Sequence, residues 1–301
     1  MPAPERVGLV GLGHMGAPIA ARLIDGGVSL TVFDVRREAM ATSGGSAATS
    51  LADVARRSDV VITLLPDGAA VRRAVVGDGT PGEDRLLDGL AAGAIVVDMG
   101  SSPPTGTQAL GKELATRGVG LIDAPVSGGV RRAADGTLAI MVGGDAATIA
   151  TCRPLLERIG ERIFTTGALG SAHAMKALNN LVSAAGLLAA GEALLIGRKF
   201  GLDPELMVDV LNASTGRNNA TEHKMKPFVL SRSFASGFSL ALMVKDLGTA
   251  VALADDTGTP APFSTECRAL WARAGAALEA GADHTAVVRW LETLAGTTLG
   301  A

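Results

Sequence analysis

The stretch Val7-Gly8-Leu9-Val10-Gly11-Leu12-Gly13-His14-Met15-Gly16 decides the fold. A short apolar run, typical of a buried strand, leads into three glycines spaced G-x-G-x-x-G, and a helical pattern follows from Ala17. The first glycine permits a tight turn, the second allows another group to approach the backbone, and the third lets the helix pack against the strand. The stretch therefore predicts the strand–turn–helix corner of an α/β domain.

The alternation of strand and helix continues through the first half of the chain. Apolar runs that predict strands lie at Val7–Val10, Leu30–Phe33, Val60–Leu64, Ile95–Val97, Leu121–Ile122 and Leu138–Val142. Helical patterns lie between or after them at Ala17–Leu23, Leu51–Arg56, Thr107–Thr116 and Ala146–Ile159. Alternating strands and helices predict a Rossmann-like, doubly wound parallel sheet with helices on both faces.

The second half of the chain is helical in its pattern. After about Thr166 the strand runs stop, and Ala174–Phe200 predicts one long helix with Gly201 as its C-cap. Further helices are predicted at Pro204–Ala213, Thr221–Ser231, Leu240–Asp256, Pro262–Ala280 and His284–Leu294. We therefore predict an α/β domain over residues 1–166 and an all-α domain over 167–301, joined by the long helix, with a cleft where they meet.

Composition limits the classes of partner. The 301 residues are 48% hydrophobic and 19% charged, which predicts a folded core rather than disorder. The formal net charge of −3 gives no reason to expect nucleic acid or a membrane surface as a partner. The apolar segment Leu181–Leu195 is interrupted by Glu192, so a buried helix is the better interpretation than a membrane span.

Cysteine and histidine usage points to a reduced compartment and away from metal. Cys152 and Cys267 lie far apart, and the four histidines show no ligand spacing, so we expect no metal site. The N-terminal residues lack the pattern of a signal peptide. A cytoplasmic protein is expected.

The glycine turn predicts a dinucleotide site. Unpaired amides at the positive end of the following helix suit a pyrophosphate. Asp34 follows the second strand, where a carboxylate accepts hydrogen bonds from the adenosine ribose and repels a 2′-phosphate. Arg36 and Arg37 come next and offer positive charge to such a phosphate. NAD is therefore the predicted cofactor, with NADP as the alternative.

A lysine and an amide on the long helix suggest acid–base chemistry. Lys176 and Asn180 stand four residues apart and share one helix face, so both can bind one substrate oxygen. Burial lowers the pKa of a lysine toward the range useful for proton transfer. Spacing alone leaves open that Lys176 is a surface lysine near the start of the helix.

Six motifs in order resemble the β-hydroxyacid dehydrogenase family, which includes 3-hydroxyisobutyrate dehydrogenase and tartronate semialdehyde reductase. They are Gly11–Pro18, Leu65-Pro66, Asp98–Ser102, Asp123–Gly129 with Gly136–Leu138, Lys176 with Asn180, and Phe238 with Lys245-Asp246. The resemblance spans nearly the whole chain. It implies hydride transfer between a nicotinamide cofactor and a small β-hydroxy acid such as 3-hydroxyisobutyrate, giving its aldehyde or ketone.

The resemblance also assigns roles to residues. Lys176 matches the catalytic lysine, which acts as general acid and base. The substrate residues that it implies are Ser127, Gly128, Gly129 and Asn180. The cofactor residues fall into two groups. The glycine turn and Asp34 supply Gly11, Leu12, Gly13, His14, Met15, Gly16 and Asp34, and the resemblance adds Leu65, Pro66, Ser101, Phe238 and Lys245.

The chain departs from the family where substrate specificity is expected to lie. Arg131 and Arg132 replace residues that are usually small, and Arg132 with Arg217 could bind a carboxylate in a planar, bidentate way. A solvated surface position is the alternative for both Arg132 and Arg217. The role of His173, one turn before Lys176, stays open: it could tune the lysine, or it could be a packed or an exposed histidine without such a role.

Two other functions compete with a dehydrogenase. An imine reductase shares the architecture but usually lacks the lysine, and a non-catalytic dinucleotide-binding protein also typically loses it. Lys176 therefore favours the dehydrogenase. Because relatives pack their helical domains together and the long helix is so apolar, a homodimer or homotetramer is expected.

Overall fold

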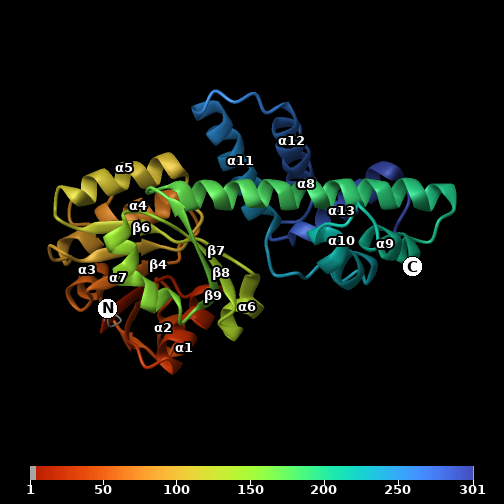
Figure 1. Ribbon diagram of the computed structural model, residues 1–301. Coiled ribbons are helices and arrows are strands. Elements are labelled where there is room, and N and C mark those ends of the chain that lie inside the picture. Colours follow the sequence, from red (N-terminus) through yellow and green to blue (C-terminus); the bar gives the residue numbers. More distant parts are fainter. Residues whose placement is uncertain (1–4, 301) are drawn as a thin grey trace. The chain divides into compact units, whose positions relative to one another are not determined.

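The computed structural model describes residues 5–300 and shows two compact units, which divide between Lys176 and Ala177. The first unit is an α/β unit and the second is helical, as the sequence predicts (Figure 1). The long helix α8, Ser171–Phe200, begins in the first unit and continues into the second. It starts three residues before the predicted Ala174, and Gly201 after it has the positive φ of +105° expected of its C-cap position.

The first unit is built on one sheet. Its strands are β1 Arg6–Val10, β2 Ser29–Phe33, β3 Ser46–Ala47, β4 Val60–Thr63, β5 Ile95–Asp98, β6 Gly120–Asp123, β7 Val126–Ser127, β8 Leu138–Gly143 and β9 Gly160–Gly167. The order is β3-β2-β1-β4-β5-β6-β8-β7, with β9 also paired to β8. From β3 to β6 all neighbours are parallel, which confirms the predicted doubly wound sheet.

The far end of the sheet is mixed, which the strand runs did not indicate. β8 lies antiparallel to β6 and β7 and parallel to β9. β9 was not predicted because most of its residues are exposed, so it lacks an apolar run.

Helices cover both faces of the sheet. They are α1 Gly16–Asp25, α2 Arg37–Ala41, α3 Leu51–Arg56, α4 Gly68–Val76, α5 Pro104–Ala115, α6 Gly129–Asp135 and α7 Ala146–Leu156. Alternate residues of one strand enter different cores: Leu9 packs in the cluster beneath α1 and Val10 in the cluster beneath α3 and α4. This strict alternation is what a two-sided sheet requires.

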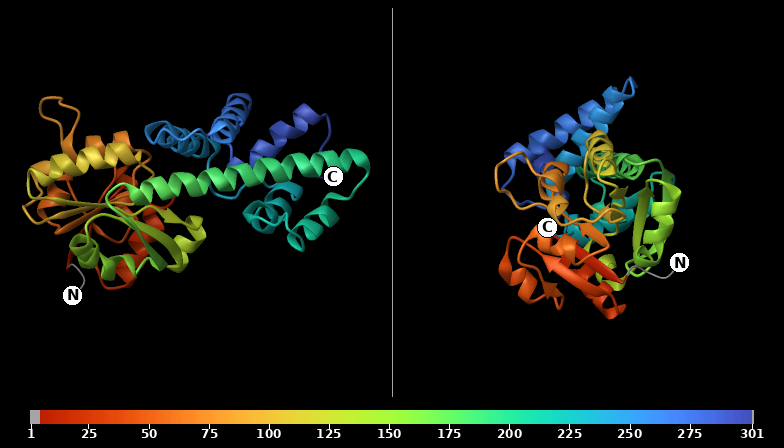
Figure 2. Two further views of the ribbon diagram at one scale, coloured as in Figure 1. Left: turned by 45° about the horizontal axis from the view of Figure 1, so that its top comes forward. Right: turned by 90° about the vertical axis from the view of Figure 1, so that its left-hand side faces the viewer.

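The second unit packs helices around the distal part of α8. They are α9 Pro204–Asn212, α10 Asn219–His223, a π-helix Met225–Leu230, α11 Leu240–Asp256, α12 Pro262–Ala277 and α13 Val287–Ala295, seen from further directions in Figure 2. The predicted single helix Thr221–Ser231 is wrong as one element. It is divided at Lys224, and Pro227 has no amide hydrogen to continue an α-helical ladder.

The core of the second unit explains the apolar stretch in α8. Leu187 and Leu194 are fully buried around Trp271, and Gly191 lets α13 approach the helix closely. By length and composition α8 could cross a membrane, yet half of its most apolar window is buried inside the protein. The buried residues of α8 in this unit are those that pack with its other helices.

Candidate active site

The turns predicted to bind the cofactor follow four neighbouring parallel strands. The order β2-β1-β4-β5 places Asp34, the Gly11–Gly16 turn, Leu65-Pro66 and Ser101 at the carboxyl ends of these strands. Carboxyl ends of parallel strands meet at one edge of a sheet, which is where open α/β sheets bind ligands. The first unit therefore brings these predicted residues together along one edge.

Each glycine of the turn has its own structural reason. Gly11 has a φ of +100°, and a Cβ atom there would overlap the backbone oxygen of Leu64. A Cβ atom at Gly16 would overlap the backbone oxygen of Gly11. At Gly13, by contrast, a Cβ atom would meet no heavy atom within 4 Å. Gly11 and Gly16 are thus required by the fold, whereas Gly13 keeps open space in front of its backbone for a ligand.

Asp34 already holds the glycine turn. Its buried carboxylate accepts hydrogen bonds from the amides of Leu12 at 2.7 Å and Arg36 at 2.8 Å, and the Arg36 guanidinium also donates to it. Burial acts to raise the pKa of Asp34, but these hydrogen bonds outweigh it and hold the pKa below its usual range. A stable negative charge therefore stands at the end of β2.

Other residues of this edge differ in exposure. His14 is exposed, and Met15 is the N-cap residue of α1 without a side-chain cap, so both contribute mainly backbone to the turn. Ser101 and Leu65 are half-buried just beyond β5 and β4. The side chains of Ser101 and Leu65 are therefore within reach of solvent, at the same edge of the sheet as the glycine turn.

The predicted substrate signature forms a turn between β7 and α6. Ser127 ends β7, and Gly128 and Gly129 have φ values of +136° and +73°, which disfavour any other residue. The stem of Arg132 lies against Gly128, while its side chain is exposed to solvent. Arg131 makes a long ion pair with Asp135, at 3.9 Å.

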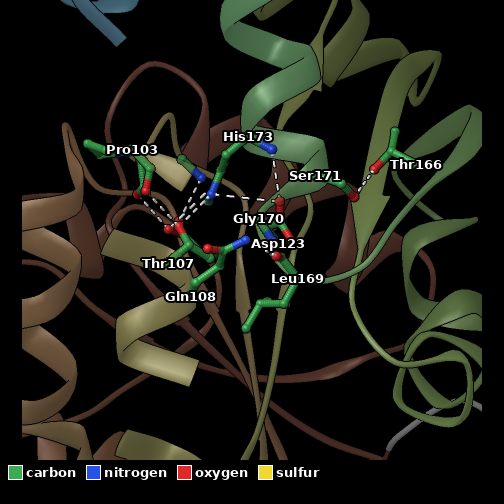
Figure 3. Close-up of polar contacts among 12 residues, drawn as sticks. Pro103, Thr107, Gln108, Asp123, Thr166, Leu169, Gly170, Ser171 and His173 are labelled. Carbon is green, nitrogen blue, oxygen red and sulfur yellow. Dashed lines mark hydrogen bonds and ion pairs between the residues drawn. The ribbon is translucent and has the colours of Figure 1, made fainter. Parts of the chain in front are cut away.

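Asp123, at the end of β6, fixes the first turn of α8 (Figure 3). Its buried carboxylate accepts hydrogen bonds from the amides of Gly170 and His173, each at 2.8 Å. A carboxylate at the N-terminus of a helix satisfies amides that have no partner within the helix and suits its dipole. This contact holds the start of α8, and with it half-buried Lys176, at the sheet's carboxyl edge.

His173 lies buried beside the same aspartate. Its Nδ1 is 2.8 Å from the Thr107 hydroxyl of α5 (Figure 3). Its Nε2 is 3.7 Å from Asp98 at the end of β5. Sequence reasoning left its role open. The structure excludes an exposed histidine, since the ring is almost wholly buried.

In the second unit, Asn180 is bound by a residue of α11. Its amide donates to Asp246 at 2.6 Å, and Asp246 also pairs with Lys245 at 3.3 Å. Asp246, part of the late motif predicted to lie on the cofactor side, therefore holds Asn180. Sequence reasoning missed this role of Asp246, since the two partners are 66 residues apart.

Phe238 precedes α11 in a segment organised by Asp283. The carboxylate accepts hydrogen bonds from Ser236 and from the amide of Gly237, each at 2.9 Å. Burial acts to raise the pKa of Asp283, but hydrogen bonds from His284 and Thr285 bring it well below its usual range. The predicted residue Arg217, in the same unit, is exposed and pairs with Glu222 at 3.7 Å.

The aspartates that shape the site share one sequence signal. Asp98 and Asp123 each end a strand whose other residues are nearly all buried. A charged residue that closes such an apolar run is a candidate for a buried polar role, and this signal could have found both. Within residues 5–300, no group of three or more histidine, cysteine, aspartate or glutamate side chains is arranged so that it could hold a metal ion.

Family models match both units. One described as the NAD binding domain of 6-phosphogluconate dehydrogenase matches residues 6–167. Another, described as NAD-binding of NADP-dependent 3-hydroxyisobutyrate dehydrogenase, matches residues 170–291.

Individual relatives match over most of the chain. The chain is 35% identical to 2-(hydroxymethyl)glutarate dehydrogenase of Eubacterium barkeri over 98% of this chain and 97% of the relative. It is 35% identical to the NAD-dependent L-serine dehydrogenase of Pseudomonas aeruginosa over 89% and 91%. A solved structure of 3-hydroxyisobutyrate dehydrogenase of Mycobacterium tuberculosis with L-serine matches at a TM-score of 0.84 and 34% identity, covering 95% of this chain and 98% of that one.

Proposed function

Because the chain belongs to the β-hydroxyacid dehydrogenase family and is an NAD(P)-dependent oxidoreductase of small hydroxy acids, we propose that Lys176 is its general acid and base. One observation carries this proposal. Asp123 binds the amides that open α8, so Lys176 stands one turn into a helix anchored at the sheet edge that carries the glycine turn.

The residues present fit a dinucleotide. The open space at Gly13 and the amides at the start of α1 suit the pyrophosphate, and Asp34 suits the adenosine ribose. Leu65, Pro66, Ser101, Phe238 and Lys245 are proposed as further cofactor contacts. The bound nicotinamide supplies the hydride acceptor or donor.

The chain's own residues supply positioning and proton transfer. In oxidation, neutral Lys176 Nζ removes the proton of the substrate hydroxyl as that carbon loses hydride. In reduction, protonated Lys176 Nζ returns the proton to the forming alkoxide. Ser127, the Gly128 and Gly129 amides, and Asn180 are proposed to bind the substrate's carboxylate and hydroxyl, so that much of the rate comes from orientation.

Arg132 and Arg217 are proposed to select the substrate. Arg132 follows directly on the Ser127–Gly129 turn, and its guanidinium is exposed beyond Gly128. An acid that carries its carboxylate near this arginine gains a charge-assisted bond. Among its relatives, one is named for 2-(hydroxymethyl)glutarate and another for L-serine, so the range of acids to test is wide.

The proposed substrate class is tested by cofactor reduction. A panel of 3-hydroxyisobutyrate, L-serine, glycerate, tartrate-type acids and 2-(hydroxymethyl)glutarate, each with NAD and NADP, is expected to include at least one acid that is turned over. Turnover only of cyclic imines with reduced cofactor would instead support an imine reductase. Tight NADH binding with no turnover of any acid or imine would support a non-catalytic dinucleotide-binding protein.

Replacing Asp34 with serine is expected to shift cofactor preference toward NADP by about tenfold in the ratio of kcat/KM values. The variant removes the charge that repels a 2′-phosphate, and it releases the Arg36 guanidinium now held by Asp34. Because Asp34 also binds the Leu12 amide, kcat/KM with NAD should fall as well.

Steady-state kinetics with both cofactors measure this ratio. Asp25→Asn is the matched control, since Asp25 is an exposed carboxylate at the end of α1. An unchanged ratio in Asp34→Ser would remove the ribose contact from the proposal.

A second copy of this chain is proposed to cover the apolar face of α8, giving a homodimer or homotetramer. Val182, Ile196 and Phe200 are 73%, 71% and 85% exposed, and their spacing puts them on one side of the helix. Exposed apolar surface of this kind marks an interaction site. Light scattering that shows a monomer at micromolar concentration would contradict it.

A cytoplasmic location is proposed from the cysteines. Burial raises the pKa of Cys152 to about 12 and that of Cys267 to about 11, so both are inert, reduced thiols. Fractionation of the source cells tests this location.

A further inference from the structure

A buried cluster of titratable groups joins three elements of the first unit. Asp98 ends β5, Asp123 ends β6, and His173 lies in the first turn of α8. His173 Nε2 is 3.7 Å from the Asp98 carboxylate, and Nδ1 is 3.9 Å from that of Asp123. All three side chains are at most 2% exposed. Asp123 anchors the start of α8, whereas Asp98 and His173 have no part in the proposed proton transfer.

Both nitrogens of the His173 ring face oxygen atoms. The Thr107 hydroxyl lies 2.8 Å from Nδ1. Nε2 faces Asp98 and has no hydrogen-bond partner among residues 5–300. A lone pair on Nε2 would point at the Asp98 carboxylate. The Thr107 hydroxyl donates to the backbone oxygen of Pro103 at 3.2 Å, so at Nδ1 it is placed to accept rather than to donate. Both carboxylates are buried, and a cation between them would offset the cost of burying their charge; the His173 ring lies within 3.9 Å of each.

Asp98 connects this histidine to the turn that carries Ser101. Its carboxylate accepts hydrogen bonds from the Gly100 amide at 2.9 Å and the Ser102 hydroxyl at 2.7 Å. These two bonds bracket Ser101. On the other side, Asp123 holds the amides that open α8. The cluster therefore links the Ser101 turn to the helix turn that precedes Lys176.

We infer that His173, as an imidazolium ion between Asp98 and Asp123, is a positioning residue that sets both the place and the proton affinity of Lys176. The inference rests on the proposed role of Lys176. The groups that face His173 are Asp98 from β5, Asp123 from β6 and Thr107 from α5, and Lys176 follows one turn along α8. Lys176 and His173 are neighbours on one helix surface, so their charges interact.

The sign of the charge effect distinguishes this role from simple packing. In the oxidation direction, kcat rises with pH as Lys176 loses its proton. His173→Gln removes a cation, which favours protonated Lys176, so the pH of half-maximal kcat moves up by about half a unit to one unit. Asp98→Asn removes an anion, so the same midpoint moves down. A loss of rigidity alone would lower kcat in both variants, but it would not move their two midpoints in opposite directions.

The experiment measures kcat against pH, NADH affinity by fluorescence, and melting temperature for each variant. His173→Gln is also expected to lose about tenfold in kcat at the parent's optimum pH, with NADH affinity within about twofold. The double variant His173→Gln with Asp98→Asn removes both charges, and its midpoint should return near that of the parent. If one of the single variants folds poorly, the midpoint of the double variant can still be compared with that of the other single variant.

Gln108→Ala is the matched control. Gln108 lies on α5 next to Thr107 and donates to the backbone oxygen of Leu169, just before α8, without entering the cluster. Its kcat and its midpoint should stay within about twofold and about 0.2 pH units of the parent.

The outcomes distinguish this inference from the proposal that Lys176 is the general acid and base. Midpoints that move in opposite directions support the inference. Unmoved midpoints, or midpoints that move the same way, overturn it even if Lys176 is essential. Full turnover in Lys176→Ala would remove the lysine assignment itself, whatever the His173 variants show.

Discussion

Lys176→Ala is expected to lose about a hundredfold to ten-thousandfold in kcat, because a positioned general acid or base contributes that much to proton transfer. Its affinity for NADH should stay within about twofold, since the glycine turn and Asp34 lie on other elements of the first unit. Lys176→Arg should be similarly slow, because a guanidinium stays protonated and cannot accept the hydroxyl proton.

Stopped-flow or steady-state reduction of the cofactor with the best acid from the panel measures this loss. Lys199→Ala is the matched control, since Lys199 is an exposed lysine near the other end of the same helix. The control should keep the parent's kcat. A Lys176→Ala variant within about fivefold of the parent would show that another group moves the proton.

The second large effect concerns two glycines of the turn: Gly13 is expected to matter for cofactor binding and Gly16 for stability. Gly13→Ala should weaken NADH binding by at least about tenfold, because the added methyl fills space that the structure leaves open at the backbone. Its melting temperature without cofactor should not change, because that methyl meets no heavy atom within 4 Å.

Gly16→Ala should behave in the opposite way. Its methyl would overlap the Gly11 backbone oxygen, so the strand–turn–helix corner must shift even when no cofactor is present. We expect a loss of about 2 kcal/mol or more in the free energy of unfolding, measured by denaturant titration of the cofactor-free protein. If Gly13→Ala destabilised the cofactor-free protein as much as Gly16→Ala does, the space at Gly13 would not be a ligand site.

Much of the fold follows from local patterns. Leu240–Asp256 was predicted from its periodicity and forms α11 with the same bounds. The strand runs predicted β1, β2, β4, β5, β6 and β8, because buried strands need apolar residues wherever they lie in the sheet. β9 escaped prediction because an exposed edge partner of β8 needs few apolar residues.

Parts of the site were readable in the same way. The glycine turn and Asp34 follow strands directly, so a strand assignment places them at the sheet edge. Lys176 and Asn180 share a helix face by spacing alone. The resemblance to known dehydrogenases was needed to choose the catalytic lysine over an ordinary surface lysine.

The sequence alone therefore determined the α/β frame, the cofactor turn and the helix that carries Lys176. Only the tertiary structure decided what holds that helix in place. Asp123 lies 50 residues from His173 in the chain, and Thr107 lies 66 residues from it. Nothing in their local patterns marks them as partners, because a buried hydrogen bond between distant residues depends on strand order and helix placement. The same reason hid the bond between Asn180 and Asp246, which forms only when α8 and α11 pack together.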